Sequence, residues 1–266
     1  MYADLKKIKN SVIAIDVGNT STHFAYFSQG KIRRQFRLRT KEAAKNGVAM
    51  LKSKFPLDRC GAVVIASVVP NEGLALEQNI FSKLEIETFL IGKDLVPPIV
   101  NLYKKPRQVG IDRLMSAIAA YAQFKKEVIV IDFGTAITFD VISKKGEYLG
   151  GVIAPGIEIS LDALFRKTAL LPKIKLKHPR SIVGKDTAES IRIGCSVGIG
   201  GLCDRIVEEI CRKYHFKPVI VATGGYANFM SKYSRSFNKI EPQLILKGVL
   251  LSYFSDQKYK TLDKKV

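Results

Sequence analysis

Two stretches of the chain combine a carboxylate with a glycine-bearing polar turn between apolar runs. In the first, Ile13–Phe27 (IAIDVGNTSTHFAYF), an apolar run ends in Asp16, and Gly18, Asn19 and Thr20 follow before apolar residues return. This pattern predicts strand, tight turn and strand, since glycine lets backbone approach a bound group and Asn and Thr hydrogen-bond readily in turns. A loop of donors with a carboxylate at its root suits a phosphate tail and its metal ion. Taken alone, the stretch also fits an ordinary hairpin.

A second stretch, Val128–Ile142 (VIVIDFGTAITFDVI), repeats the first half a chain later. Asp132 stands 116 residues after Asp16, and further positions match at the same offset without a gap. The matched pairs are Asp16 with Asp132, Gly18 with Gly134, Thr22 with Thr138, and Gly30 with Gly146. An internal duplication of this kind predicts two similar domains that face each other, with both loops aimed into one cleft.

Two further motifs could hold parts of a substrate. In Gly110–Arg113, an aspartate at the expected start of a helix could act as a base, and Arg113 offers a fork for a carboxylate. Tyr103 and Pro106 could wall the same pocket, although Asp112 could equally serve only as a helix cap. Thr223–Gly225 follows a strand, and its glycines would let a flat ring or ribose lie against bare backbone, or would form a simple turn.

The length and composition indicate two α/β domains. A chain of 266 residues corresponds to roughly two domains of ordinary size, and 47% apolar residues suffice for packed cores. We place the domains at 1–125 and 126–266. The longest apolar runs fall well short of the ~20 residues of a membrane span, and the first residues do not resemble a signal peptide. We therefore expect a cytoplasmic protein without a membrane partner.

The apolar periodicity predicts the same kinds of element in both halves. In the first half, strands are expected at Lys31–Thr40, Gly61–Val69 and Thr88–Ile91, with helices at Lys41–Lys54, Glu72–Lys83 and Asp112–Lys125. In the second half, strands are expected at 128–133, 137–142, 147–153 and Pro218–Ala222, with helices at Gly156–Ala169, Ala188–Tyr214 and Gln243–Phe254.

The formal charge of +19 favours anionic partners such as nucleotides, acidic metabolites or nucleic acid. Basic residues cluster at Lys31, Arg33, Arg34, Arg37 and Arg39, and again at Lys173, Lys175, Lys177 and Arg180. The alternation in the second cluster predicts one basic row on a strand or extended loop. Neither cluster contains the interleaved aromatics that stack bases, so a solvated surface is favoured over a nucleic-acid site.

Together, and in this order, the motifs resemble the type III pantothenate kinases, also called the Bvg accessory factor family, over about residues 12–252. Two motifs resemble the family's phosphate loops, one its pantothenate motif and one its adenosine motif. The phosphate loops are Asp16–Thr20 and Asp132–Thr138, the pantothenate motif is Gly110–Arg113, and the adenosine motif is Thr223–Gly225. The family's central segment is matched by Gly150–Gly156 and Thr168–Pro172.

The resemblance implies a fold of the actin-like, sugar-kinase and Hsp70 superfamily. This fold has two ribonuclease-H-like α/β domains with the active site in the cleft between them, and such kinases usually pair as homodimers. The implied reaction is ATP-dependent phosphorylation of pantothenate to 4′-phosphopantothenate, the first step of coenzyme A biosynthesis.

The resemblance also implies a role for each motif residue. Asp112 would be the base, and Asp132 would hold the monovalent cation, potassium or ammonium. Pantothenate would be held by Tyr103, Gly110, Ile111, Asp112, Arg113 and Thr187. ATP, with magnesium on its phosphates, would be bound by Asp16, Val17, Gly18, Asn19, Thr20, Ser21, Thr22, His23, Thr135, Gly224 and Gly225.

Departures from the family pattern and two alternative functions stay open. The family commonly has Asn where this chain has Asp186, and an acidic or amide residue near Lys104–Lys105. One alternative is a superfamily kinase for a sugar or acetate, which Gly110–Arg113 weighs against. The other is a regulatory or nucleic-acid-associated accessory protein, motivated by the charge, which the presence of all three aspartates weighs against.

Overall fold

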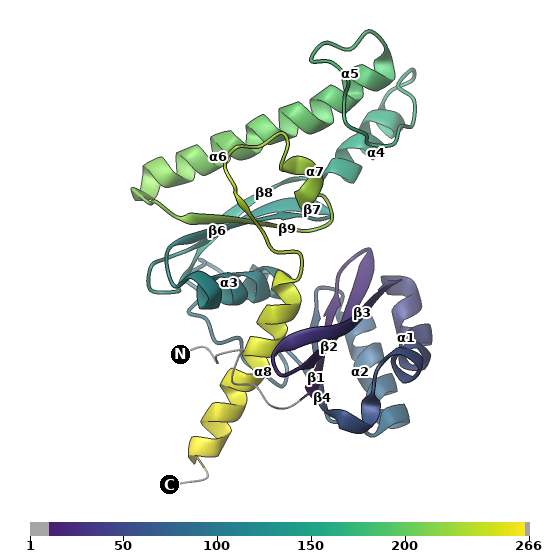
Figure 1. The fold of residues 1–266 in the computed structure, drawn as a ribbon, viewed down its shortest axis with the longest axis vertical. Coiled ribbons are helices and arrows are strands. Elements are labelled where there is room, and N and C mark those ends of the chain that lie inside the picture. Colours follow the sequence, from purple (N-terminus) through teal and green to yellow (C-terminus); the bar gives the residue numbers. More distant parts are fainter. Residues whose placement is uncertain (1–10, 264–266) are drawn as a thin grey trace. The chain divides into compact units, whose positions relative to one another are not determined.

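Two five-stranded sheets with the same strand order form the framework of the chain (Figure 1). The computed structural model describes residues 11–263, with side chains for residues 11–256. The first sheet has the order β3–β2–β1–β4–β5, with β1 Ser11–Val17, β2 Ser21–Ser28, β3 Lys31–Arg39, β4 Cys60–Ser67 and β5 Thr88–Leu90. The second has the order β8–β7–β6–β9–β10, with β6 Val128–Phe133, β7 Ala136–Ile142, β8 Tyr148–Pro155, β9 Val219–Thr223 and β10 Lys239–Ile240.

The central strand of each sheet carries one of the two aspartates. Strand β1 pairs antiparallel with β2 and parallel with β4, and β6 pairs antiparallel with β7 and parallel with β9. A strand bonded on both edges and covered on both faces must be apolar almost throughout. Accordingly, Val12–Ile15 and Val128–Ile131 are fully buried. The runs that identified the duplication in the sequence are therefore the cores of the two sheets.

Helices α1 (Thr40–Lys54) and α2 (Pro70–Leu84) cover one face of the first sheet. Alternate residues of β1, Ile13 and Ile15, pack with Leu51 of α1 and Leu76 of α2, as period-2 side-chain alternation requires. All four side chains are fully buried. Both helices were expected from the sequence, and their bounds lie within about two residues of the prediction.

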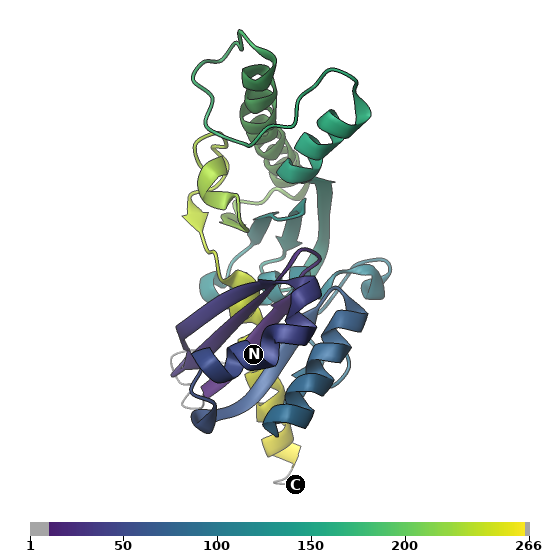
Figure 2. The ribbon, with the colours of Figure 1, turned by 90° about the vertical axis from the view of Figure 1, so that its right-hand side faces the viewer.

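The C-terminal helix α8 (Leu244–Asp263) lies on the other side of this sheet (Figures 1 and 2) and contacts β1 and β4. It also packs closely on α3 (Ile111–Phe124), because a Cβ added at Gly248 of α8 would lie 2.0 Å from the Met115 carbonyl oxygen. Ser252 Oγ lies 3.4 Å from Met115 Sδ in the same contact. The last helix of the chain thus completes the core of the first sheet.

The second sheet is packed by α4 (Ile157–Lys167), α7 (Ala227–Met230) and a long helix. The helix predicted over 188–214 is present as α5 (Thr187–Ile193), a π-helical turn over Gly194–Gly198, and α6 (Ile199–Tyr214). Residues 171–179, between α4 and α5, form neither helix nor strand, and Ile174 and Leu176 pack on the core. The lysines that alternate with them are exposed, so the predicted basic row is confirmed.

The described residues form two compact units that are not continuous in sequence. One unit holds the residues up to Gln123, with Gly146–Tyr148 and the residues from Gln243 onward, and the other holds Phe124–Lys145 and Leu149–Pro242. The C-terminal residues join the first unit because α8 packs on β1, β4 and α3. The division 1–125 and 126–266 stays a prediction about the duplicated halves.

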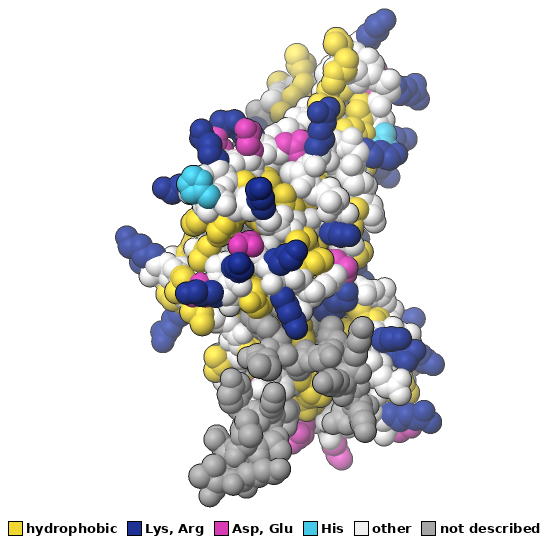
Figure 3. All heavy atoms as spheres, turned by 60° about the vertical axis from the view of Figure 1, so that its left-hand side comes forward, with side chains coloured by type: hydrophobic (Ala, Val, Ile, Leu, Met, Phe, Trp, Pro, Cys, Tyr) yellow, Lys and Arg dark blue, Asp and Glu magenta, His cyan; other side chains and the backbone are white. Residues whose placement is uncertain are grey.

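The surface is basic, and its cations are dispersed on the face drawn in Figure 3. There, Lys and Arg side chains stand mostly singly among white and yellow atoms and do not gather into one patch (Figure 3). This arrangement agrees with a solvated basic surface. No described helix combines the length and the hydropathy needed to cross a bilayer.

Two neighbouring glycines of α6 should respond oppositely to alanine. A Cβ at Gly200 would lie 2.2 Å from the Tyr233 carbonyl oxygen, whereas a Cβ at Gly201 would meet nothing within 4 Å. We expect Gly200→Ala to lower the free energy of unfolding in urea by about 1–3 kcal/mol through overpacking. Gly201→Ala should keep it or raise it by up to ~1 kcal/mol, since alanine favours helix. Equal effects of the two variants would contradict this packing.

Candidate active site

The turn after β1 is fixed by a hydrogen bond within the turn and by hydrogen bonds from the first residue of α1. The Gly18 N–H donates to the Ser21 carbonyl at 3.1 Å, and the Thr40 N–H donates to the Thr20 carbonyl at 3.2 Å. Thr40 Oγ1 also donates to the Gly18 carbonyl at 2.6 Å. A Cβ at Gly18 would lie 3.1 Å from the Ser21 oxygen, so glycine suits this tight turn. Asn19 and Thr20 are exposed at its tip, where a ligand can reach them.

Strand register assigns the polar residues of this hairpin to opposite faces. Asp16 lies opposite His23, and Val17 lies opposite Thr22. Directly opposed residues share a face, so Asp16 and His23 lie together while Thr22 points to the other side. Thr22 is fully buried, and its Oγ1 lies 3.3 Å from Thr40 Oγ1. Val17 and Thr22, both expected at the ATP site, thus have side chains on the packed face of the sheet.

The second hairpin is one residue shorter, which corrects one match of the ungapped repeat. Asp132 lies opposite Thr138, six residues on, whereas Asp16 lies opposite His23, seven residues on. Thr138 therefore corresponds to His23, and its match with Thr22 is wrong. The match of Gly30 with Gly146 holds, since both have positive φ, +67° and +83°, in the turn after the second strand.

Sequence reasoning missed two cations on the Asp16 face. Strand β3 places Arg37 opposite His23 and Arg39 opposite Ser21, so both arginines are on the side of the sheet that carries Asp16. Both are exposed. They were interpreted only as part of a solvated cluster, and the signal that could have found them is the register of β2 with β3.

His23 is neutral at physiological pH. Burial, reinforced by the Arg37 charge, lowers the pKa of His23 to about 4. Its Nε2 lies 3.2 Å from Ser21 Oγ, a neighbour on the same face of β2. A neutral imidazole and a hydroxyl can donate hydrogen bonds beside the Asp16 carboxylate without adding charge.

The start of α3 positions Asp112 and Arg113. The Arg113 N–H donates to Asp112 Oδ1 at 2.8 Å, and a Cβ at Gly110 would lie only 2.5 Å from the same oxygen. Burial raises the pKa of Asp112 above its usual range, although the Arg113 N–H and the Arg113 charge act in the opposite direction. Asp112 is the second residue of α3 and accepts the N–H of its own neighbour, so it is not the N-cap of this helix, and burial makes it a carboxylate with increased basicity.

Gly110 connects this motif to the end of the central strands. A Cβ at Gly110 would lie 3.7 Å from Val68 Cγ1, and the Val68 N–H donates to the Val17 carbonyl at 3.0 Å. Val68 follows β4, the parallel neighbour of β1. The aspartate at the end of β1 and the motif Gly110–Arg113 are thus brought to the same end of the first sheet.

Arg113 and Tyr103 meet around a tyrosine that sequence reasoning missed. Arg113 is buried, and its Cζ lies 5.9 Å from the ring centroid of Tyr148. The Tyr103 ring lies 6.4 Å from that of Tyr148, which is fully buried. The Tyr148 N–H and carbonyl bond Val100 and Leu102, so the tyrosine is anchored to the loop before Tyr103. From the sequence alone, Tyr148 is recognisable only as a residue at the start of a strand, with no motif that marks it as part of a site.

In the second unit, Asp132 and two predicted motifs converge. Asp132 lies opposite Thr223 on the parallel strand β9. Gly224 follows with φ +88°, and a Cβ there would lie 2.3 Å from Asp132 Oδ1. Gly156 abuts the neighbouring turn, because its Cβ would lie 2.0 Å from the Thr135 carbonyl oxygen. Carboxylate, polar turn and glycine turn therefore share one corner of the sheet.

The oxygen atoms at this corner are of the kind that bind metal cations. One carboxylate, Asp132, stands beside the turn whose Gly134 and Thr135 carbonyls lie against Gly156. Hard cations prefer such oxygen ligands. Within the described residues, no three His, Cys, Asp or Glu side chains gather as a metal site.

Thr187 lies apart in sequence and lines a largely apolar pocket between α4 and α5. The pocket has a volume of about 680 Å³ and includes Lys167 and Thr168 beside Thr187. Asp186, the departure from the family pattern, caps α5, since its Oδ1 accepts the Glu189 N–H at 2.7 Å. Asn and Asp serve almost equally well at this position, which explains how the departure is tolerated.

Comparisons with known proteins agree on one family. A family model described as type III pantothenate kinase matches residues 12–209. The type III pantothenate kinase of Anaeromyxobacter sp. (strain K) is 40% identical over 245 residues, which cover 90% of this chain and 96% of that protein. That of Syntrophotalea carbinolica is 36% identical over 253 residues, which cover 92% and 99%.

Solved structures with low sequence identity share the fold. A Baf family protein from Campylobacter jejuni has a TM-score of 0.59 at 19% identity, with coverage of 92% of this chain and 99% of that chain. A ROK family protein from Streptococcus pneumoniae has a TM-score of 0.51 at 13% identity, with coverage of 94% and 99%. Together with the sheet order, these likenesses show two ribonuclease-H-like domains of the actin-like type.

The lowered pKa of His23 makes a pH-dependent contribution to stability. Between pH 4 and 6.5 the unfolded chain protonates this histidine while the native protein does not, so stability falls as the pH falls through that window. We expect the difference in free energy of unfolding between wild type and His23→Gln to change by at most about 3 kcal/mol across it. Urea titrations at several pH values measure this difference. A difference that stays constant with pH would contradict the assignment.

Proposed function

Because the chain belongs to the type III pantothenate kinase family, we propose that it phosphorylates pantothenate with Asp112 as the general base. The family's reaction is ATP-dependent and forms 4′-phosphopantothenate, the first step of coenzyme A biosynthesis. The observation that carries the role of Asp112 is its setting. The carboxylate is held at the start of α3, half-buried, with a raised pKa and at the same end of the sheet as Asp16.

The proposed step is an in-line transfer. The Asp112 carboxylate accepts the proton of the substrate alcohol, the alcohol oxygen forms a bond to the γ-phosphorus, and the bond to the bridging oxygen of ADP breaks. Such transfers depend mainly on positioning and charge stabilisation. Magnesium, when bound with ATP, neutralises phosphate charge.

For pantothenate, the arrangement of Tyr103, Tyr148 and Arg113 supports a carboxylate site. Arginine binds carboxylates through two parallel N–H bonds, and packing over the Tyr148 ring fixes its orientation. Gly110 and Ile111 would present the start of α3 to the substrate. Thr187, with its pocket of about 680 Å³, would contribute from the second unit.

For ATP, the turn residues from Asp16 to His23 would bind phosphate, and Thr135, Gly224 and Gly225 would bind from the second unit. The exposed tip at Asn19 and Thr20 supports this role. To the residues expected from the sequence we add Arg37 and Arg39, whose cations border the Asp16 face. Asp132 would hold potassium or ammonium.

We further propose a cytoplasmic homodimer, on the family resemblance. Sedimentation velocity would then give twice the chain mass of 29.6 kDa.

Asp112→Asn should separate chemistry from binding. We expect kcat to fall by about 10²–10⁴, the usual contribution of a general base, while ATP affinity measured by calorimetry stays near wild type. Stability at pH 7 should be kept or raised, since burial penalises the charged form that Asn removes. The exposed variant Asp58→Asn is the control. Near-normal turnover of Asp112→Asn in a coupled assay would remove Asp112 from the role of base.

Asp132→Asn tests the cation site. We expect wild-type ATP binding to tighten when potassium replaces a large organic cation, and the variant to lose this dependence, because an amide lacks the charge that balances the ion. Calorimetry without pantothenate measures it independently of turnover. An unchanged potassium dependence in the variant would place the ion elsewhere.

A further inference from the structure

The loop before α3 carries Tyr103 and is closed by Asn101, a residue outside all the sequence motifs. Asn101 Oδ1 accepts the Tyr103 N–H at 3.0 Å, and Asn101 Nδ2 donates to the Pro106 carbonyl at 3.2 Å. The same carbonyl accepts the Val109 N–H at 3.3 Å, just before α3 begins. One amide side chain therefore uses both its acceptor and its donor to hold the two sides of the loop together around Tyr103.

The backbone on both sides of Asn101 is bonded to Tyr148. Asn101 and Tyr148 form a parallel bridge. In it, the Tyr148 N–H donates to the Val100 carbonyl at 2.9 Å, and the Leu102 N–H donates to the Tyr148 carbonyl at 2.9 Å. All of these residues belong to the first unit. The loop is thus fixed twice, by the Asn101 amide from within and by the Tyr148 backbone from outside.

The position of Tyr148 is in turn set by α3. A Cβ at Gly146 would lie 2.5 Å from Tyr121 Cε1, so the turn before β8 packs directly on this helix. The buried Tyr148 ring lies beside both the Tyr103 ring and the Arg113 guanidinium. Because α3 carries both Tyr121 and Arg113, the loop and the helix start are fixed relative to the same tyrosine.

We infer that Asn101 and Tyr148 are positioning residues for pantothenate, because they hold Tyr103 and Arg113 in the arrangement that receives the substrate. This role rests on the proposed function, in which Tyr103 and Arg113 are pantothenate ligands. A loop that is already closed in the free protein needs no ordering on binding, whereas a loop that must close first binds in proportion to its closed fraction. Loss of the Asn101 bonds should therefore weaken pantothenate and leave the reaction in the closed complex almost unchanged.

Steady-state kinetics of two Asn101 variants of the full chain test this role. Asn101→Ala should raise the KM for pantothenate about tenfold, because both side-chain bonds are lost. Asn101→Asp should raise it only about threefold, because its carboxylate still accepts the Tyr103 N–H but cannot donate to the Pro106 carbonyl. In both variants kcat and the KM for ATP should stay within about twofold of wild type.

Tyr148→Leu tests the ring, since it removes the aromatic contacts and retains the backbone bonds. It should raise the KM for pantothenate at least as much as Asn101→Ala does. Phe139→Leu, at a fully buried position of the second sheet, is the control for loss of a buried ring and should leave this KM unchanged. The Asn101 variants decide the matter if Tyr148→Leu does not fold.

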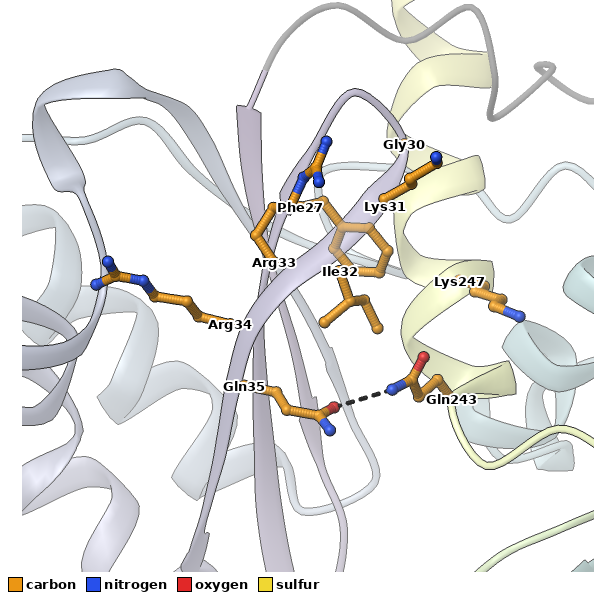
Figure 4. Close-up of a pocket in the computed structure, with 9 residues that line it drawn as sticks. All are labelled: Phe27, Gly30, Lys31, Ile32, Arg33, Arg34, Gln35, Gln243 and Lys247. Carbon is orange, nitrogen blue, oxygen red and sulfur yellow. Dashed lines mark hydrogen bonds between the residues drawn. The ribbon is translucent and has the colours of Figure 1, made fainter.

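Gln243→Ala is the matched control for Asn101→Ala. Gln243 is half-buried, as Asn101 is, and its Nε2 donates to Gln35 Oε1 at 3.2 Å within the first unit. Figure 4 shows this bond joining β3 to the start of α8, among side chains that do not belong to the loop. The control should keep the KM for pantothenate within about twofold of wild type.

Hydrogen exchange measures the positioning without turnover. The Tyr103 N–H is bonded to Asn101 Oδ1, so it should exchange faster in Asn101→Ala than in wild type or Gln243→Ala. Saturating pantothenate should reduce this difference, because the substrate selects the closed loop. Faster exchange that pantothenate does not reduce would show that the loop has no part in binding.

The outcomes separate this role from the proposed function. A wild type without pantothenate turnover would overturn the proposed function and the positioning role with it. If the wild type is active, an unchanged KM for pantothenate in Asn101→Ala would overturn the positioning role alone. Equal increases in the KM for pantothenate and for ATP, or an equal effect of Gln243→Ala, would also overturn it, because general damage to the unit would then explain the result.

Discussion

The structure depends on placing an aspartate at the end of a fully buried central strand in each sheet. Burying a carboxylate is costly unless donors or cations compensate, and the strand itself offers none beyond its ladder. Each strand therefore leads into a turn whose glycine lets backbone come close to the carboxylate or to the turn itself. Gly18 does so after Asp16, and Gly134 and Gly224 do so around Asp132. The site chemistry and the folding requirement are thus met by the same turns.

The Asp112 carboxylate is also partly buried, but it is stabilised at the start of a helix and not at the end of a strand. It sits on the first turn of a helix, where the backbone N–H groups lack partners and favour a carboxylate. Its Oδ1 accepts the Arg113 N–H, which also donates to the Gly110 carbonyl, yet burial still raises the pKa of Asp112. A base needs both properties, because the hydrogen bond fixes the carboxylate in space while burial increases its affinity for a proton. Gly110 makes the arrangement possible by leaving room for the carboxylate.

The duplication could be predicted because both copies contain long apolar runs, whereas the hairpin lengths and the strand register could not. The predicted strands and long helices are confirmed, since buried central strands and amphipathic helices impose their periods directly on the chain. The sequence did not predict the one-residue difference between the hairpins, because a turn can lose a residue without changing the residues that identify it. For the same reason Thr22 was matched with Thr138, although the strand register puts them on different faces.

The sequence by itself determined the two α/β halves, the motif order and, through it, the family, because these depend on local residue types and spacing. Only the tertiary structure decided which side chains share a face, since strand register and long-range packing set that choice. It brought Arg37 to the Asp16 face, placed Tyr148 beneath Arg113, and joined α8 to the first sheet. Each of these depends on residues distant in the chain, and their approach is fixed by burial and backbone bonding, which no short motif records.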